Sequence, residues 1–285
     1  MMYGLLAALC WGITGLAAAY AARRLGAFLT VITGEAVALA GFGTLMLASH
    51  GTFRSAGPAV WPLLAAGAVG VAGYLANYRG LEVGQVGLVS AISATYGGVI
   101  VLLSVGILGE RLDTAAAAGI ALAVAGVMLA AWRGGPGLVS AAAPKTATSI
   151  LFGLAAALCY GVSGFLLGSY SRQVGWLVPL VIARSGAMAI LLGLLATPLR
   201  RPAGQRLLPG LAWAVAAGLA DAAGLICFTR GDQVGLVAVT AAASSVYPVI
   251  PLIGGLVLLR ERLARWQIGG AVLTIAGVAL LAAGS

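Results

Sequence analysis

The chain has 285 residues, of which 61% are hydrophobic and 8% are charged, and its mean hydropathy is +1.07. Soluble domains carry about 25% charged residues, so this composition excludes a water-soluble protein and indicates one that lies in a membrane. The net charge of +9 would suit nucleic-acid binding, but the arginines flank apolar stretches singly or in pairs. In that position they anchor helices at the membrane surface, and we expect no nucleic-acid partner.

Ten apolar stretches, each with at most one charge, follow one another along the chain. A bilayer-spanning helix needs about 20 apolar residues, so each stretch predicts one membrane span and the fold class is all-α. The first stretch lacks the basic segment of a cleavable signal peptide, and we expect it to be retained. The predicted spans lie within residues 1–22, 25–53, 55–78, 83–109, 114–132, 146–171, 173–199, 207–229, 233–259 and 266–285.

The second half of the chain repeats the first. Gly4–Gly15 returns as Gly153–Gly164, with eight of the twelve residues identical. Each copy has five spans, so the second copy must cross the membrane in the opposite sense. Residues 1–132 and 149–285 are therefore predicted to form inverted repeats, joined by a linker at 133–148. This architecture is typical of secondary transporters, which bind substrate between the repeats. A duplication retained only for stability is the alternative.

Several short motifs recur in a fixed order. They are Leu9-Cys-Trp-Gly12 and Leu158-Cys-Tyr-Gly161, Arg184, Tyr247-Pro-Val-Ile-Pro251, and Gly109-Glu-Arg-Leu112 with Arg260-Glu-Arg-Leu263. With this order and spacing, each half resembles an EamA domain of the drug/metabolite transporter superfamily, over essentially the whole chain. The resemblance implies movement of small metabolites or amino acids through a central cavity. Spans 1, 3, 4, 6, 8 and 9 would line that cavity, with spans 5 and 10 at the periphery.

The resemblance also implies a location, a multi-pass protein of the bacterial cytoplasmic membrane with a cytoplasmic N-terminus. The basic residues argue for the opposite orientation, because four would lie on the N-terminal side and eleven on the other. Small multidrug resistance relatives carry an acid in their first helix. Here the nearest polar residues are Thr14 and Ser163, which argues against proton-coupled cation antiport.

Three ionisable residues lie well inside predicted spans, namely Glu35, Arg184 and Asp221. Intramembrane charges are costly and point to function. Glu35 and Arg184 are repeat equivalents whose depths differ by roughly 7 Å. They would form a structural ion pair, or a gate or carboxylate-binding site at Arg184. Asp221 lies near mid-depth, and its equivalent in the first copy is Gly70. It would bind a proton or a substrate ammonium, or donate a structural hydrogen bond.

Aromatic and hydroxyl residues supply the other candidate substrate contacts. Trp11 and Tyr160 occupy equivalent places, and the Ser/Tyr pair at 93 and 96 matches the pair at 244 and 247. A spacing of three puts each pair on one helical face. Aromatic walls with a few polar groups are typical of small-molecule pockets, although helix packing uses the same residues. The candidates are Trp11, Tyr74, Asn77, Tyr78, Ser93, Tyr96, Tyr160, Asp221, Ser244 and Tyr247, with Asn77 and Tyr78 alternatively serving as interfacial anchors.

The ninth predicted span contains Pro248 and Pro251, and the matching part of the fourth contains Gly97-Gly98. Proline removes helical hydrogen bonds, so both spans are predicted to be weakened at the same depth. This would make a hinge near the substrate or a tolerated kink. Glu35, Arg184, Asp221, Pro248 and Pro251 are accordingly the candidate gating or coupling residues.

The sequence therefore predicts a transporter that moves a small neutral or zwitterionic, amino acid-like metabolite by alternating access, as an exporter. Proton-coupled efflux of organic cations, centred on Asp221 and Glu35, is the first alternative. An intramembrane enzyme or a channel is the second, but no arrangement of catalytic residues supports an enzyme. His50 stands alone and the three cysteines lie within spans, so we expect neither a metal nor a cofactor. We expect a monomer, because one chain carries both repeats. The partners we expect are the substrate and the bilayer, and the proton-coupled alternative would add protons.

Overall fold

The computed structural model describes residues 1–50, 56–84, 86–131, 139–195 and 207–250, and the separate positions 266, 269, 270, 272, 273, 276, 277 and 280. The described part of the chain is helical and contains no strand. Its helices are α1 (Met2–Leu25), α2 (Ala27–Ala48), the 3-10 helix η1 (Gly57–Ala59), α3 (Val60–Val83), α4 (Val86–Ser93), α5 (Tyr96–Leu108), α6 (Thr114–Ala131), α7 (Val139–Val174), α8 (Leu177–Leu195), α9 (Leu207–Val234) and α10 (Val237–Ser244).

Six helical segments of the described chain are long and apolar enough to cross a membrane. They are Met2–Leu25, Ala27–Ala48, Gly57–Val83, Thr148–Val174, Leu177–Leu195 and Leu208–Val234, and they coincide with the predicted spans 1, 2, 3, 6, 7 and 8. Two shorter apolar helices, Tyr96–Leu108 and Thr114–Gly126, lie in the predicted spans 4 and 5. The end of predicted span 9, with Pro251, and most of span 10 lie outside the described residues, as does the motif at 260–263.

Two helices continue past the charges that ended their predicted spans. α3 runs through Arg79 to Val83, and α9 runs through Arg230 to Val234. Arginine side chains can reach polar surroundings from a helix end without breaking the backbone, so a charge marks the membrane surface better than it marks the end of a helix. Similarly, α7 begins at Val139, so much of the predicted linker is helical.

Sharp turns follow α1 and α7 at equivalent glycines. Gly26 has φ 82° and Gly175 has φ 85°, a conformation that costs little only for glycine. Each glycine separates two helices that belong to the same half of the chain. The sequence thus encodes the same turn twice, at positions 149 residues apart.

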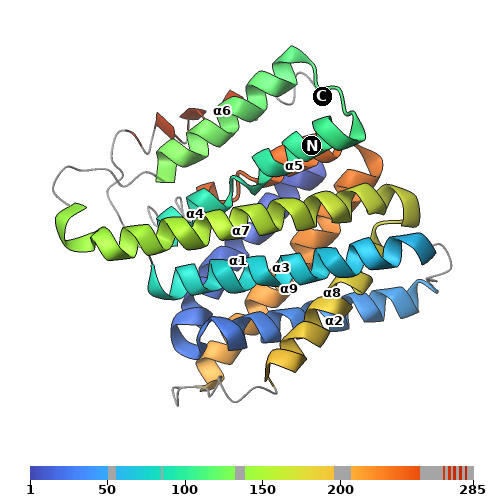
Figure 1. Cartoon of the computed structure of the whole chain (residues 1–285), viewed down its shortest axis with the longest axis horizontal. Helices are drawn as coiled ribbons and strands as arrows, with labels where there is room; N and C mark the ends of the chain where they lie inside the picture. The colour runs from blue at the N-terminus through green and yellow to red at the C-terminus, as the bar shows by residue number, and fades with distance from the viewer. Residues whose placement is uncertain are drawn as a thin grey trace.

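The helices pack in reciprocal pairs. α1 lies along α9, and its equivalent α7 lies along α3; in Figure 1, α3 and α7 run side by side across the front of the molecule. The glycines of α1 and α7 allow close approach. A Cβ added at Gly4 would lie 2.7 Å from the Cβ of Ala243 in α10, and one added at Gly153 would lie 2.8 Å from the Cβ of Ile92 in α4. α6 lies at the edge of the bundle (Figure 1).

Two helices are interrupted at equivalent points. The helix that begins at Val86 stops at Ser93, turns through Ala94 and Thr95, and resumes as α5 at Tyr96. α10 stops at Ser244 and is followed by a turn over residues 245–248. The predicted weakening of these spans therefore takes the form of a broken helix in both, although the first break precedes Gly97-Gly98 rather than falling on it.

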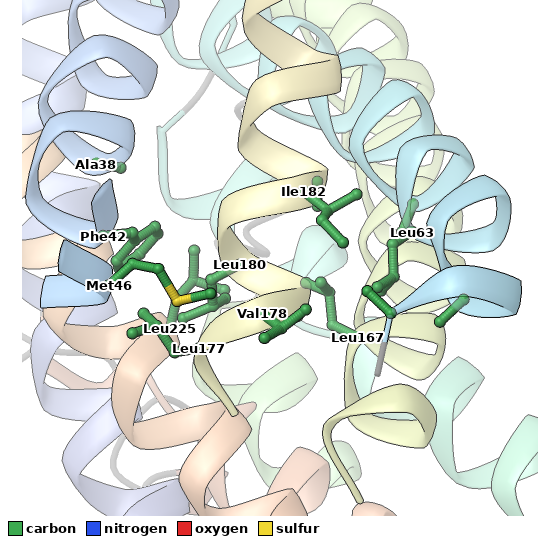
Figure 2. Packing of buried hydrophobic residues seen from close by; sticks show 14 of the residues in the cluster. Ala38, Phe42, Met46, Leu63, Leu167, Leu177, Val178, Leu180, Ile182 and Leu225 are labelled. Carbon is green, nitrogen blue, oxygen red and sulfur yellow. The ribbon is translucent and has the colours of Figure 1, made fainter. Parts of the chain in front are cut away.

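Two clusters of packed apolar side chains border the central cavity described below. One cluster joins α2, α3, α7, α8 and α9, and Figure 2 shows Phe42 and Met46 of α2 facing Leu177 and Leu225. A second cluster joins small residues of α1 to α2, α3 and α8. Leu167, Leu180 and Leu225 belong to the first cluster and also line the cavity, whereas Val71, Tyr78 and Ala187 link the second cluster to it.

Candidate functional site

A cavity of about 120 Å³ lies among α1, α2, α3, α7, α8 and α9, with contributions from Tyr96 of α5 and from Tyr247. This volume holds several water molecules or one small organic solute. Glycine and alanine residues keep the helices close enough to enclose it, while larger side chains from each helix project into it. The lining includes the predicted residues Trp11, Glu35, Tyr74, Asn77, Tyr78, Tyr96, Tyr160, Arg184, Asp221 and Tyr247.

The three buried charges meet in the wall of this cavity. Arg184 donates through Nη1 to Glu35 Oε1 and through Nη2 to Asp221 Oδ2, the latter at 2.5 Å. Nη2 also donates to the hydroxyl of Tyr74 at 3.0 Å, and Tyr74 in turn donates to Asp221 Oδ1 at 2.8 Å. The sequence predicted the first pairing as one alternative. It did not predict that Asp221 shares the same guanidinium.

Aromatic side chains form a continuous belt around the cavity. Ring centroids are 5.5 Å apart for Trp11 and Phe228, 6.0 Å for Trp11 and Tyr96, 6.4 Å for Tyr96 and Tyr160, and 5.1 Å for Tyr160 and Tyr74. Tyr78 continues the belt at 5.9 Å from Tyr74. Tyr78 and Asn77 are each 7% exposed and line the cavity, so neither serves as an interfacial anchor in this structure.

Two reciprocal hydrogen bonds join the interrupted helices. Tyr96 Oη and Ser244 Oγ lie 2.6 Å apart, and Ser93 Oγ and Tyr247 Oη lie 2.8 Å apart. Tyr247 also donates to the carbonyl of Ser90 at 3.1 Å. The tyrosines of these pairs line the cavity. The serines are not among the lining residues and hold the tyrosine hydroxyl groups by hydrogen bonds. Pro248 lies in the turn after α10 and not among the lining residues.

The two sequence copies differ at Asp221 and Gly70, and Gly70 lies close to α7. A Cβ added at Gly70 would lie 2.9 Å from Ser163 Oγ, so a side chain there would require the Ser163 hydroxyl to shift. Ser163 itself donates to the carbonyl of Ala66 at 2.9 Å, while its equivalent Thr14 is bonded to the carbonyl of Cys10 at 3.0 Å. These hydroxyls are thus engaged with backbone.

A second charged cluster lies at the end of the bundle where α7 and α9 end. It was not predicted from the sequence. Glu110 is buried and accepts hydrogen bonds from the backbone N–H groups of Val237 and Ala238, at 3.1 and 3.0 Å. Arg172 binds Glu110 at 2.8 Å and the carbonyl of Asp232 at 3.0 Å. Asp232 is fully buried, although its position between predicted spans suggested a loop. The repeated Glu-Arg-Leu motif, which begins at Glu110, is the sequence feature that could have predicted this cluster.

No group of three or more metal-binding side chains occurs in the described residues. The described residues that line the cavity supply one guanidinium, two carboxylates, the Asn77 amide, hydroxyl groups and aromatic faces. Such a set can bind a polar group and enclose an apolar body, as ligand pockets do.

Comparison with known proteins agrees with the helical architecture. One solved structure, described as the crystal structure of a protein, aligns with this chain at a TM-score of 0.74 and 21% sequence identity. The alignment covers 98% of this chain and 94% of the other chain. This identity supports the fold alone. No curated protein matches the sequence. The profile of the EamA-like transporter family matches residues 1–132 and 147–283. The family predicted from the short motifs is therefore confirmed, and the chain belongs to the EamA-like transporter family of the drug/metabolite transporter superfamily.

Proposed function

We propose that the protein is a secondary transporter that carries one small organic solute through the central cavity by alternating access. The observation that carries this proposal is a cavity that combines buried charges with an aromatic belt, in a member of a transporter family. Buried charges inside a membrane are retained where they serve a transport pathway. The direction we propose is export, across the bacterial cytoplasmic membrane, by a single chain.

The arrangement of contacts supports two inverted repeats of five spans. Arg23 of α1 donates to the carbonyl of Leu81 at 3.4 Å, and its equivalent Arg172 donates to the carbonyl of Asp232 at 3.0 Å. Contacts also join equivalent residues directly, as between Glu35 and Arg184. Reciprocal contacts of this kind are the mark of a two-fold relation. We therefore retain 1–132 and 149–285 as the two repeats.

Alternating access needs elements that can change shape around a fixed site. The breaks after Ser93 and Ser244 supply them, because each leaves a short helical segment that can move relative to its neighbour. The Ser–Tyr hydrogen bonds between the two interrupted helices couple the two segments to the aromatic belt. We propose that these segments and the turn at Pro248 form the moving part. Pro251 stays a candidate gating residue that lies outside the described residues.

The sequence left two substrate classes open, a neutral or zwitterionic metabolite and an organic cation. Both are compatible with a cavity of this size. Neither a phosphorylated nor a polyanionic solute suits it, because Arg184 is the one cationic residue among the described residues that line it, and it already binds two carboxylates.

Counter-exchange in vesicles tests the proposed function. Purified protein in liposomes is loaded with a solute that stabilises it against thermal unfolding, and uptake of the labelled solute is followed. A carrier gives saturable uptake that is accelerated by unlabelled solute on the opposite side. Unsaturable flux without acceleration would indicate a channel and would contradict the proposal.

A further inference from the structure

Among the described residues that line the cavity, acidic side chains outnumber basic ones by one. The ionisable lining includes two carboxylates, Glu35 and Asp221, and one guanidinium, Arg184. These side chains are 2%, 6% and 6% exposed, in the same order. A buried charge is tolerated when a partner balances it. With its carboxylates ionised, the wall therefore lacks one positive charge.

The charge of Arg184 is already shared by two carboxylates. Three of its five N–H donors are engaged, Nη1 with Glu35 and Nη2 with Asp221 and Tyr74. A substrate carboxylate would bring a third acid to this one guanidinium and would add a second uncompensated negative charge to a buried site. The charge balance therefore disfavours the acid group of an amino acid.

Glu35 presents a free acceptor. Its Oε2 atom is buried and has no hydrogen-bond partner among the described residues, although its Oε1 atom binds Arg184. An ionised carboxylate oxygen only accepts hydrogen bonds. A ligand that occupies this place must bring a donor, and a charged donor also supplies the missing positive charge.

The aromatic belt favours the same ligand. Tyrosine and tryptophan faces attract cations that lie within about 6 Å of the ring centroid, and the guanidinium carbon of Arg184 already lies 4.9 Å from the centroid of Tyr74. The remaining rings, from Trp11 to Tyr160, surround space for an apolar body.

Building on the proposed transport function, we propose that the substrate is a monocationic primary or secondary amine with an apolar or aromatic body and no carboxylate. Its ammonium group binds at Glu35 Oε2, balanced by the excess charge that Glu35 and Asp221 share. Its body lies within the belt of aromatic side chains. The substrate is thus an organic ammonium compound rather than an amino acid.

A matched series of ligands tests this assignment on the unmodified protein. Phenethylamine, its neutral N-acetyl derivative and phenylalanine share one aromatic body, while isoamylamine and its N-acetyl derivative form a smaller aliphatic pair. Binding to purified protein near neutral pH is measured by calorimetry and by thermal unfolding, since neutral amines cross bilayers unaided and complicate flux measurements. We expect each amine to bind at least about tenfold more tightly than its amide, and phenethylamine more tightly than phenylalanine.

The variant Glu35→Gln keeps the shape of the side chain and removes the charge. It should lower the affinity for phenethylamine by at least about tenfold and leave the affinity for the N-acetyl derivative unchanged. Glu82→Gln is the matched control, because Glu82 lies outside the cavity and binds Arg79 and the backbone N–H of Ala27. If Glu35→Gln does not fold, the ligand series decides alone.

Tighter binding of an amide or of phenylalanine would overturn the assignment, as would no binding by either amine. Unchanged affinity for phenethylamine in Glu35→Gln would also overturn it. These outcomes are separable from failure of the proposed function. Counter-exchange of a bound amide or amino acid would support the transporter and contradict the amine assignment. Binding of an amine whose uptake is no faster than its passive uptake by protein-free liposomes would support the assignment and contradict the transport proposal.

Discussion

At the scale of single residues, Arg184 is the centre of the site. It binds acids from two other helices, Glu35 of α2 and Asp221 of α9, and thereby ties these helices to α8 around the cavity. Buried ion pairs contribute little net stability compared with well-packed apolar residues, but loss of one partner leaves an uncompensated charge. Removal of one charged group of the cluster should therefore change the free energy of unfolding very differently from removal of all three.

Replacing Arg184 with methionine should lower the free energy of unfolding by about 3 kcal/mol or more, because two buried carboxylates lose their partner. The triple variant Glu35→Gln, Arg184→Met, Asp221→Asn should regain more than half of that loss, since no ionised group remains. Denaturant unfolding in detergent, followed by circular dichroism, measures both. A triple variant that is no more stable than the single one would contradict this account of the cluster.

At the scale of helices, Glu110 links the end of α5 to the start of α10. Its carboxylate caps two backbone N–H groups of α10 and binds Arg172 of α7. An acidic group at a helix N-terminus satisfies unpaired donors and interacts favourably with the helix dipole. This contact holds three elements together where α10 enters the bundle.

The variant Glu110→Ala should therefore lower the free energy of unfolding by about 2 kcal/mol, from lost hydrogen bonds and from the unpaired donors left behind. Hydrogen exchange should accelerate in peptides that cover residues 235–240, at the start of α10. The adjacent variant Arg111→Ala serves as the control, because Arg111 is exposed and should change neither quantity. Unchanged exchange in Glu110→Ala would show that the cap does not hold α10.

At the scale of the whole molecule, contacts occur in equivalent pairs related by an offset of about half the chain. α1 packs on α9 as α7 packs on α3, and the Ser–Tyr bonds connect residues 93 and 96 with 247 and 244. If the halves are inverted repeats, equivalent residues that do not lie on the axis face opposite sides of the membrane.

Arg24 and Gln173 are such a pair, at the ends of α1 and α7. Single cysteines introduced there, in protein whose native Cys10, Cys159 and Cys227 are replaced by alanine, should react with a membrane-impermeant maleimide from opposite sides. Intact cells and inverted membrane vesicles provide the two exposures. The result also decides between the two orientations that the family resemblance and the distribution of arginines support. Labelling of both cysteines from one side would reject the inverted arrangement.

Several features were predictable because they depend on local chemistry. Apolar stretches of sufficient length must form helices in a bilayer, since their backbone groups have no other partners. Glu35, Arg184 and Asp221 stood out because charge is rare in such stretches. The broken helices were anticipated from Pro248 and from Gly97-Gly98. Helix ends at Val83 and Val234 were not predicted, because the charged side chains before them do not interrupt the backbone.

The sequence by itself determined the membrane environment, the family and the residues that deserved scrutiny, because composition, repetition and buried charge are properties of the chain. Only the tertiary structure decided how those residues combine. That Asp221 and Glu35 share one guanidinium, that Tyr78 faces the cavity and that Glu110 caps α10 all depend on contacts between segments distant in sequence. Such contacts follow from which helix faces meet, and a pattern within one helix cannot specify its partner's face.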